Sequence, residues 1–223
     1  PTEEARQNLI RENKGAAQIF VTGNTMIDAL RTTVDSDYQH DHLKWADGNR
    51  LLLVTAHRRE NLGKPMANMF RAIRKIVEQV GDIKVIYPVH LNPRVREMAD
   101  KHLGGCDRIR LIEPLDVIDF HNFMARSYLI LTDSGGVQEE APSLGKPVLV
   151  MRDTTERPEG VKAGTLRLVG TREEDIYKAC MELLNDREQY RKMSHAINPY
   201  GDGHAAERIV QVIMDLCSQG GIV

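Results

Sequence analysis

The chain of 223 residues is poor in cysteine, has little net charge and contains no long apolar run. Its three cysteines (Cys106, Cys180 and Cys217) form no CxxC pair, which argues against a disulfide framework or a thiolate zinc site and favours a reducing cytoplasm. No apolar run approaches the roughly 18 residues of a membrane span. A net charge of −2 does not favour binding to nucleic acid or to an anionic membrane. The HxH pair, His40 and His42, has no third ligand nearby in the sequence, so no metal site is predicted.

The sequence does contain an alternation of strand and helix patterns. Residues 65–80 place an apolar stripe on one helical face, and residues 172–185 and 204–218 repeat that pattern. Continuous apolar runs between such helices are typical of strands buried on both faces of a parallel sheet. The predicted strands are 18–22, 51–55, 84–89, 108–112, 128–132, 147–151 and 165–169. This order predicts an α/β fold with a Rossmann-like, doubly wound parallel sheet, and residues 35–50 are predicted to form a polar loop.

Histidines and arginines follow two of these strands. Ligands of open α/β sheets bind at the carboxyl ends of the strands. HRREN (57–61) contains His57, which can protonate a leaving phosphate near neutral pH, and two arginines whose guanidinium groups match phosphate geometry. HLNP (90–93) places His90 on the same edge. Each segment taken alone is also compatible with an ordinary solvated loop, and their shared edge favours joint use.

Two further segments at this edge contain candidate ligand contacts. In EPLDVIDFHNFM, Phe120 can stack on a base, although it shares a helical face with Val117 and Met124 and core packing is the default for all three. In the segment RDTTERPEG, Arg157 either reaches a ligand at the edge or stays in solvent.

The segment TDSGG follows the strand pattern YLILT and opens a helix with two glycines. Gly135 and Gly136 have no Cβ, so another molecule can approach the backbone, and the first amides of a helix have no intrahelical partner. Ser134 can cap this helix or donate to a phosphate oxygen, and the carboxylate of Glu140 could accept from ribose hydroxyls. The spacing is neither GxGxxG nor a Walker loop. The alternative to a phosphate site is an ordinary capped turn.

Motifs along nearly the whole chain resemble the non-hydrolysing UDP-N-acetylglucosamine 2-epimerases, most closely those of Gram-positive bacteria. These motifs are VTGNTMIDAL (21–30), LLLVTAHRREN (51–61), YPVHLNP (87–93), EPLDVIDFHNFM (113–124), LTDSGGVQEEAPSLGKPVLVMRDTTERPEG (131–160) and NPYGDGHAAERI (198–209). The resemblance implies the C-terminal half of a GT-B fold, in which two Rossmann-like halves enclose a cleft. It also implies interconversion of UDP-N-acetylglucosamine and UDP-N-acetylmannosamine for cell-surface polysaccharides. In that reaction UDP is eliminated to give a 2-acetamidoglucal and re-added after inversion at C2, without a metal or nicotinamide cofactor.

The resemblance assigns a role to each candidate residue by motif. His57 matches a histidine that assists the UDP group, and Arg58 and His90 match contacts to a second, activating UDP-N-acetylglucosamine. The other matches are Ser134, Gly135 and Gly136 for the phosphates, Glu140 for the ribose, Phe120 for the uracil side and Arg157 for a further ligand contact. Leu115 stands where relatives can have glutamine, so a contact at Leu115 would use its backbone.

The resemblance also implies a division of the chain, which opens with Pro1 in a charged helical stretch. Residues 1–45 would come from the inter-domain region, 46–203 would form the UDP-binding domain, and 204–223 would form a helix that crosses back to an N-terminal Rossmann-like half. In the family that half supplies the carboxylates that act at C2. We therefore expect this chain to hold UDP but to be weak or inactive alone. We also expect an exposed apolar stripe on its last helix that can drive self-association, and a homodimer for the complete enzyme.

Two other functions fit many of the same residues. One is the donor half of a GT-B glycosyltransferase that uses a UDP-sugar, which would require an acceptor. HRREN, YPVHLNP and TERPEG occur together and favour the epimerase over that alternative. The other is a non-catalytic domain that binds a UDP-sugar.

Overall fold

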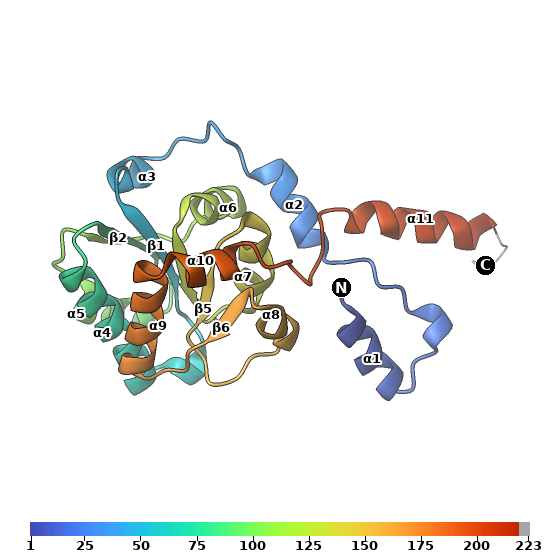
Figure 1. The fold of residues 1–223 in the computed structure, drawn as a ribbon, viewed down its shortest axis with the longest axis horizontal. Coiled ribbons are helices and arrows are strands. Elements are labelled where there is room, and N and C mark those ends of the chain that lie inside the picture. The colour runs from blue at the N-terminus through green and yellow to red at the C-terminus, as the bar shows by residue number, and fades with distance from the viewer. Residues whose placement is uncertain (219–223) are drawn as a thin grey trace.

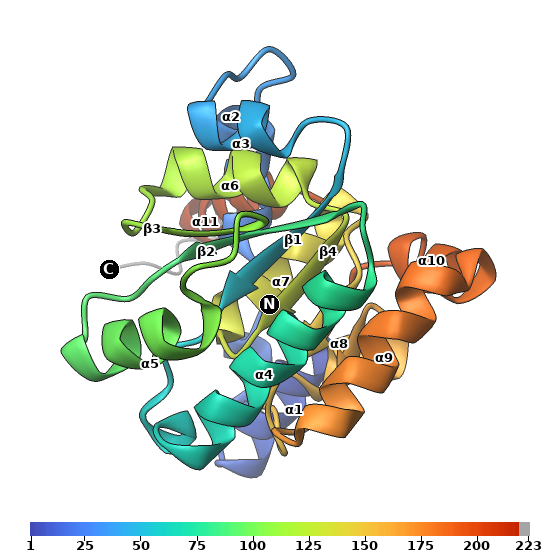
Figure 2. The ribbon, with the colours of Figure 1, turned by 90° about the vertical axis from the view of Figure 1, so that its left-hand side faces the viewer.

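A six-stranded parallel sheet forms the centre of the molecule (Figure 1, Figure 2). The computed structural model describes residues 1–218. The strand order is β3-β2-β1-β4-β5-β6, so the chain builds outward from β1 in one direction and then in the other. The strands are β1 (Arg50–Thr55), β2 (Ile83–Pro88), β3 (Ile109–Ile112), β4 (Leu129–Thr132), β5 (Val148–Val150) and β6 (Leu166–Leu168). This topology confirms the doubly wound parallel sheet that the sequence predicts.

Helices cover both faces of the sheet. Figure 2 shows α4, α5 and α9 on one side and α3 and α6 on the other. Within the described residues the helices are α1 (Glu3–Arg11), α2 (Thr25–Thr33), α3 (Asp41–Ala46), α4 (Lys64–Gln79), α5 (Pro93–Leu103), α6 (Val117–Arg126), α7 (Gly135–Glu140), α8 (Pro158–Ala163), α9 (Glu173–Asn185), α10 (Arg187–Ser194) and α11 (Ala205–Ser218). The 3₁₀ turns are η1 (Ala16–Gln18), η2 (Arg59–Asn61) and η3 (Ala141–Leu144).

The central strand β1 contributes to two separate hydrophobic cores. Leu52 and Val54 pack into the core beneath α4 and α9, whereas Leu51 and Leu53 pack into the core beneath α3 and α6. Successive side chains of a strand point to opposite faces, so a strand between two helical layers must be apolar at every position. The run LLLV satisfies that requirement.

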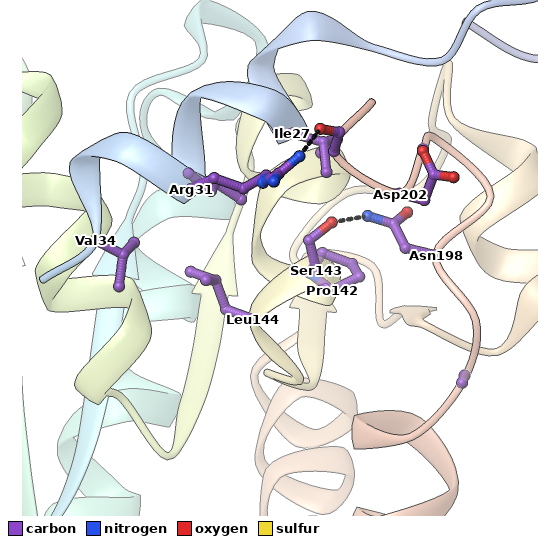
Figure 3. A pocket seen from close by; sticks show the side chains of 12 residues that line it. Ile27, Arg31, Val34, Pro142, Ser143, Leu144, Asn198 and Asp202 are labelled. Atoms are coloured by element: carbon purple, nitrogen blue, oxygen red, sulfur yellow. Dashed lines mark hydrogen bonds between the residues drawn. The ribbon is translucent and has the colours of Figure 1, made fainter. Parts of the chain in front are cut away.

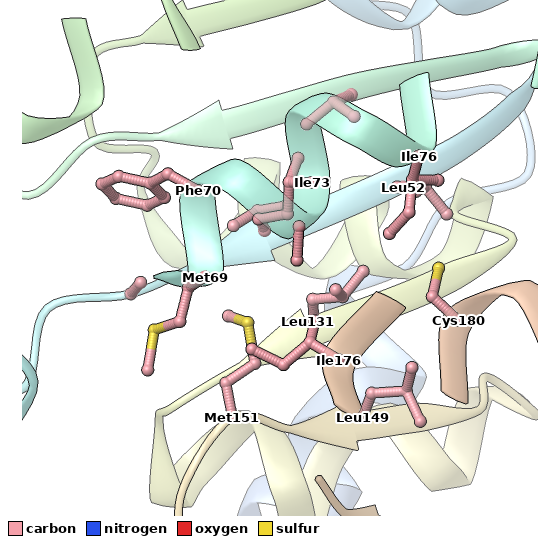
Figure 4. Packing of buried hydrophobic residues seen from close by; sticks show 14 of the residues in the cluster. Leu52, Met69, Phe70, Ile73, Ile76, Leu131, Leu149, Met151, Ile176 and Cys180 are labelled. Atoms are coloured by element: carbon pink, nitrogen blue, oxygen red, sulfur yellow. The ribbon is translucent and has the colours of Figure 1, made fainter. Parts of the chain in front are cut away.

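Helix α4 carries the apolar stripe that the sequence predicts. Its residues Met66, Met69, Phe70, Ile73, Ile76 and Val77 are fully buried against the sheet. Figure 4 shows part of this stripe packed near Leu131, Ile176 and Cys180. Residues spaced three and four apart share one face of a helix, which is why this pattern predicted the helix to within one residue at each end.

The prediction of a strand at 18–22 is wrong. The turn η1 ends at Gln18, and residues 19–24 have no regular secondary structure. Phe20 and Val21 are 46% and 43% exposed and line a groove with residues of α1 and α11. A strand needs a neighbouring strand for its backbone hydrogen bonds, and this segment does not pair with the sheet.

The prediction that residues 35–50 form only a loop is also wrong. Residues 41–46 form α3, and the side chain of His40 accepts a hydrogen bond from the backbone N–H of His42 at 3.1 Å. Leu43 and Ala46 lie three residues apart on the buried face of this helix. Most of the surrounding residues are polar, so these two core positions do not form a recognisable helical pattern in the sequence.

The last described helix, α11, extends away from the sheet (Figure 1). The carboxylate of Asp28 on α2 accepts hydrogen bonds from the backbone N–H groups of Ala205 and Ala206 and so fixes its first turn. Val210, Ile213 and Met214 are about half exposed, as expected for an apolar stripe without a partner. Self-association through this stripe stays a prediction. No helix among residues 1–218 has the length and apolar character needed to cross a membrane.

We predict that Ile76→Ala lowers the free energy of unfolding by about 2–5 kcal/mol, because the substitution removes buried methyl groups and leaves a cavity. Ile197→Ala is the matched control, since Ile76 is fully buried whereas Ile197 is 87% exposed. The control should change the free energy of unfolding by no more than about 0.5 kcal/mol. Urea denaturation measures both values, and similar losses in the two variants would contradict the packing described for α4.

Candidate functional site

The carboxyl ends of four neighbouring strands surround a cavity of about 380 Å³. The strands run parallel, so the segments that follow them meet at one edge of the sheet. The predicted site residues that line this cavity are His57, His90, Leu115, Phe120 and Ser134. Thr55, Pro88, Leu91, Pro114 and Val137 complete the lining. The structure thus brings together residues that the sequence placed after four different strands.

A buried carboxylate joins two of these segments. Asp133, which follows β4, is fully buried. It accepts hydrogen bonds from the backbone N–H groups of His57 (3.1 Å) and Arg58 (2.9 Å) and from the side-chain amide of Asn61 (2.9 Å). Burial and the nearby Asp133 charge raise the pKa of Tyr87, whose hydroxyl donates to the carbonyl oxygen of Ala56 at 2.5 Å. Asp133 is not among the predicted site residues, although an acid directly before SGG is a visible signal in the sequence.

The imidazole of His57 lies between this carboxylate and a second histidine. Its Nδ1 is 3.5 Å from an Asp133 oxygen, and its ring stacks on that of His90 with centroids 5.4 Å apart and planes 9° apart. The side chain of His57 is 39% exposed. Because Nδ1 faces Asp133, Nε2 is the nitrogen on the side away from that carboxylate. A histidine oriented in this way can exchange a hydrogen bond or a proton with a ligand in the cavity.

Three guanidinium groups pair with carboxylates at this edge of the sheet. Arg58 donates to Glu156 at 2.6 Å, Arg152 donates to Glu156 at 2.5 Å, and Arg157 donates to Glu139. Burial raises the pKa of Glu156, but hydrogen bonds from a backbone N–H and from Arg152 and Arg58 together outweigh it and lower the pKa to about 2. Arg152 and Glu156 are not among the predicted site residues, because their pairing depends on the tertiary fold.

The glycine segment begins α7 and lies close to two of these arginines, Arg58 and Arg157. A Cβ on Gly135 would lie 3.0 Å from a Glu156 oxygen, 3.6 Å from an Arg58 nitrogen and 3.9 Å from an Arg157 nitrogen. The side chain of Ser134 makes no capping hydrogen bond, and its backbone N–H donates to the hydroxyl of Thr132 at 2.9 Å. The Ser134 hydroxyl is therefore not committed to the helix.

Glu140 lies at the other end of α7 and faces back toward the glycines. A Cβ on Gly136 would lie 3.3 Å from one Glu140 oxygen. Its other oxygen is 3.4 Å from Nε2 of the buried His121, whose Nδ1 is 2.7 Å from the hydroxyl of Thr33. This contact holds the carboxylate of Glu140 in one position next to the glycine segment.

Helix α6 presents one apolar wall of the cavity. Phe120 is partly buried and lines the cavity beside Leu115. Met124 is fully buried, as expected from its helical face. Val117 is 52% exposed, so the default of core packing is wrong for this residue. Val117 is the first residue of the helix, where the helical face extends beyond the edge of the core.

A second cavity, of about 530 Å³, lies among α2, η3 and residues 196–203 (Figure 3). Its lining includes Ile27, Leu30 and Val34, and its polar groups pair with one another. Asn198 donates to the hydroxyl of Ser143 at 2.5 Å, and Arg31 donates to the carbonyl oxygen of Gly203 at 2.9 Å. This cavity has the larger volume, but no histidine among the described residues lines it. The edge at which β1, β2, β3 and β4 end, here called the strand-end edge, combines two histidines with the glycine segment.

The strand-end edge offers three kinds of interaction side by side. Its cavity supplies an apolar wall and two stacked imidazoles, and guanidinium groups lie next to the glycine segment. Such a site fits a ligand with a flat ring at one end and an anionic group at the other. Within residues 1–218, no group of three or more His, Cys, Asp or Glu side chains is placed to hold a metal ion.

Comparison with known sequences gives a match along most of the chain. A family model described as UDP-N-acetylglucosamine 2-epimerase matches residues 1–214. The UDP-N-acetylglucosamine 2-epimerase of Bacillus subtilis (strain 168) is 64% identical over 214 residues, which cover 96% of this chain and 56% of that protein. The chain thus spans a little over half the length of this relative.

Solved structures show the same correspondence. The S. aureus MnaA–UDP co-structure has a TM-score of 0.95 and 53% identity, covering 100% of this chain and 60% of that chain. UDP-GlcNAc 2-epimerase from Neisseria meningitidis bound to UDP-GlcNAc has a TM-score of 0.89 and 41% identity, covering 96% and 60%. These likenesses confirm the expected fold class, the C-terminal half of a GT-B fold.

We predict that Asp133→Asn lowers the free energy of unfolding by about 1.5–3 kcal/mol, the range for hydrogen bonds to a charged group. The amide protons of His57 and Arg58 should also exchange faster with solvent, because both donate to this carboxylate. Denaturant unfolding and hydrogen exchange measure the two effects. Asp107→Asn is the control, since Asp107 is exposed and should change the free energy of unfolding by less than about 0.5 kcal/mol. Unchanged exchange at His57 and Arg58 would refute the role of Asp133.

Proposed function

Because the chain belongs to the UDP-N-acetylglucosamine 2-epimerase family, we propose that it binds the UDP portion of UDP-N-acetylglucosamine at the strand-end edge. The observation that carries this proposal is the convergence of His57, His90, Leu115, Phe120 and Ser134 around one cavity. Structures of an S. aureus relative with UDP and of a Neisseria meningitidis relative with UDP-GlcNAc support the choice of ligand.

The nucleotide is assigned to the cavity from its apolar wall to the glycine segment. The uracil ring packs against Phe120, with Leu115 contributing its backbone. The ribose hydroxyls donate to Glu140, whose carboxylate is held close to Gly136 by His121. An apolar platform at one end and an anion site at the other orient the nucleotide in a single direction.

The phosphates are assigned to the start of α7. Ser134 has a hydroxyl that makes no capping bond, and Gly135 and Gly136 allow close approach to the backbone. Arg157 lies next to Gly135 and supplies a permanent positive charge. Together these groups hold an anion by hydrogen bonds and by charge.

For the complete enzyme we propose epimerisation at C2 by elimination and re-addition. Loss of the C2 proton and cleavage of the C1–O bond release UDP and leave a 2-acetamidoglucal. Addition of UDP at C1 and return of a proton to C2 from the opposite face give UDP-N-acetylmannosamine. His57, oriented by Asp133, assists the departing UDP by donating to its phosphate. The base at C2 is assigned to the part of the relatives that lies outside the matched region, so this chain alone is proposed to be weak or inactive.

Two further assignments follow from the same placement. Arg58 and His90 are proposed to contact a second, activating UDP-N-acetylglucosamine. The stacking of His90 on His57 would place that molecule beside the reacting one. The complete enzyme is proposed to act as a homodimer.

Gly136→Asp should weaken UDP binding at least about tenfold more than Gly136→Asn, because the two side chains have nearly the same shape and only Asp adds a negative charge at the phosphate site. Both side chains meet the same neighbour, since a Cβ on Gly136 would lie 3.3 Å from a Glu140 oxygen. Titration calorimetry with UDP measures the affinities, and thermal melting checks that both variants fold. Equal affinities would place the phosphates elsewhere.

Phe120→Leu should weaken UDP binding by about five- to 150-fold, the equivalent of about 1–3 kcal/mol for one base stacked on an aromatic ring. Its affinity for inorganic pyrophosphate should not change, because pyrophosphate has no base. Val117→Ala on the same helix is the control, since Val117 is exposed and does not line the cavity. Calorimetry with both ligands gives the comparison. Equal weakening of UDP and pyrophosphate binding would mean that the Phe120 substitution distorts the site as a whole.

A further inference from the structure

The carboxylate of Glu156 lies against the glycine segment that is assigned to the phosphates. One of its oxygens would be 3.0 Å from a Cβ on Gly135, closer than either neighbouring guanidinium group. This oxygen accepts from Arg58 at 2.6 Å, and the other accepts from Arg152 at 2.5 Å. A phosphate group can bridge two arginines in the same way, because its oxygens accept hydrogen bonds from separate guanidinium groups. Glu156 therefore occupies a position that has the chemistry of an anion site.

The arginines around Glu156 are all paired with carboxylates. Arg157 pairs with Glu139, and Arg152 pairs with Glu60 at 3.1 Å as well as with Glu156. An incoming phosphate brings extra negative charge into this set. It can use the guanidinium group of Arg152 only if it replaces Glu156 as the acceptor, and this replacement also releases Arg58, which is assigned to the second UDP-N-acetylglucosamine.

The exposure of these side chains permits such a replacement. The side chain of Glu156 is 41% exposed, so its carboxylate can leave for water at low cost. The side chain of Arg152 is only 8% exposed, but its Nε keeps Glu60 as a partner. The buried guanidinium of Arg152 thus remains paired while Glu156 exchanges with a ligand.

We propose that Glu156 is an internal competitor that occupies the phosphate site of the ligand-free protein and sets the affinity for the nucleotide. This inference rests on the proposed function, because it assigns the competing ligand as the phosphate of UDP. When a binding-competent state is only a fraction of the population, the apparent affinity falls by that fraction. Engagement of Glu156 in about nine molecules out of ten would weaken UDP binding about tenfold. A ligand without phosphate does not compete with Glu156 and is unaffected.

The test compares the variants Glu156→Gln and Glu60→Gln with the wild-type chain. Glu156→Gln should bind UDP about three- to tenfold more tightly, because a neutral amide holds the two arginines less strongly. Glu60→Gln removes the same charge from a carboxylate that also pairs with Arg152, and it should not tighten UDP binding, because Arg152 then has Glu156 as its remaining carboxylate partner. Calorimetry measures UDP, and NMR titration measures uridine, whose affinity should not change in either variant.

A second variant separates position from charge. Glu156→Asp keeps the negative charge, but its shorter side chain cannot reach Arg58 and Arg152 together. It should therefore also bind UDP more tightly than wild type, and thermal melting checks that each variant is folded. If the wild-type chain binds UDP and Glu156→Gln binds it no more tightly, the inference is overturned. The proposed nucleotide site is then unaffected. An equal gain in Glu60→Gln would overturn it as well, since net charge would then be the cause. Absence of UDP binding in the folded wild-type chain would overturn both the inference and the proposed function.

Discussion

The strand-end site depends on one buried carboxylate. A charged group without contact to water is costly unless hydrogen bonds replace its hydration, and Asp133 obtains them from backbone and side-chain N–H groups of the segment after β1. These bonds fix the start of the loop that carries His57 and Arg58. The same carboxylate directly precedes Ser134 and the glycines, so the histidine and the glycine segment are positioned by a single residue.

Near Asp133, the arginines of the site are paired with acidic side chains. Arg58, Arg152 and Arg157 each have a carboxylate partner. Pairing keeps the three guanidinium groups ordered and limits the repulsion between them. An anionic ligand must therefore reorganise existing ion pairs when it binds, which links its affinity to the acidic residues as closely as to the basic ones.

Helix α2 holds the start of α11 and the connection that precedes it. Asp28 on this helix caps α11, and Arg31 donates to the carbonyl oxygen of Gly203 in the connection that precedes α11. These contacts fix the direction of α11, whose apolar side chains stay about half exposed.

The sequence by itself determined the alternating elements, because burial on both faces demands continuous apolar strands and burial on one face demands the helical period. It also placed His57, His90 and Phe120 on the ligand edge, since parallel strands end there. Only the tertiary structure decided that 18–22 has no strand partner, that Asp133 bonds the segment after β1, and that Glu156 pairs with Arg58 across 98 positions. Such contacts depend on which distant segments the fold brings together, and no local pattern encodes them.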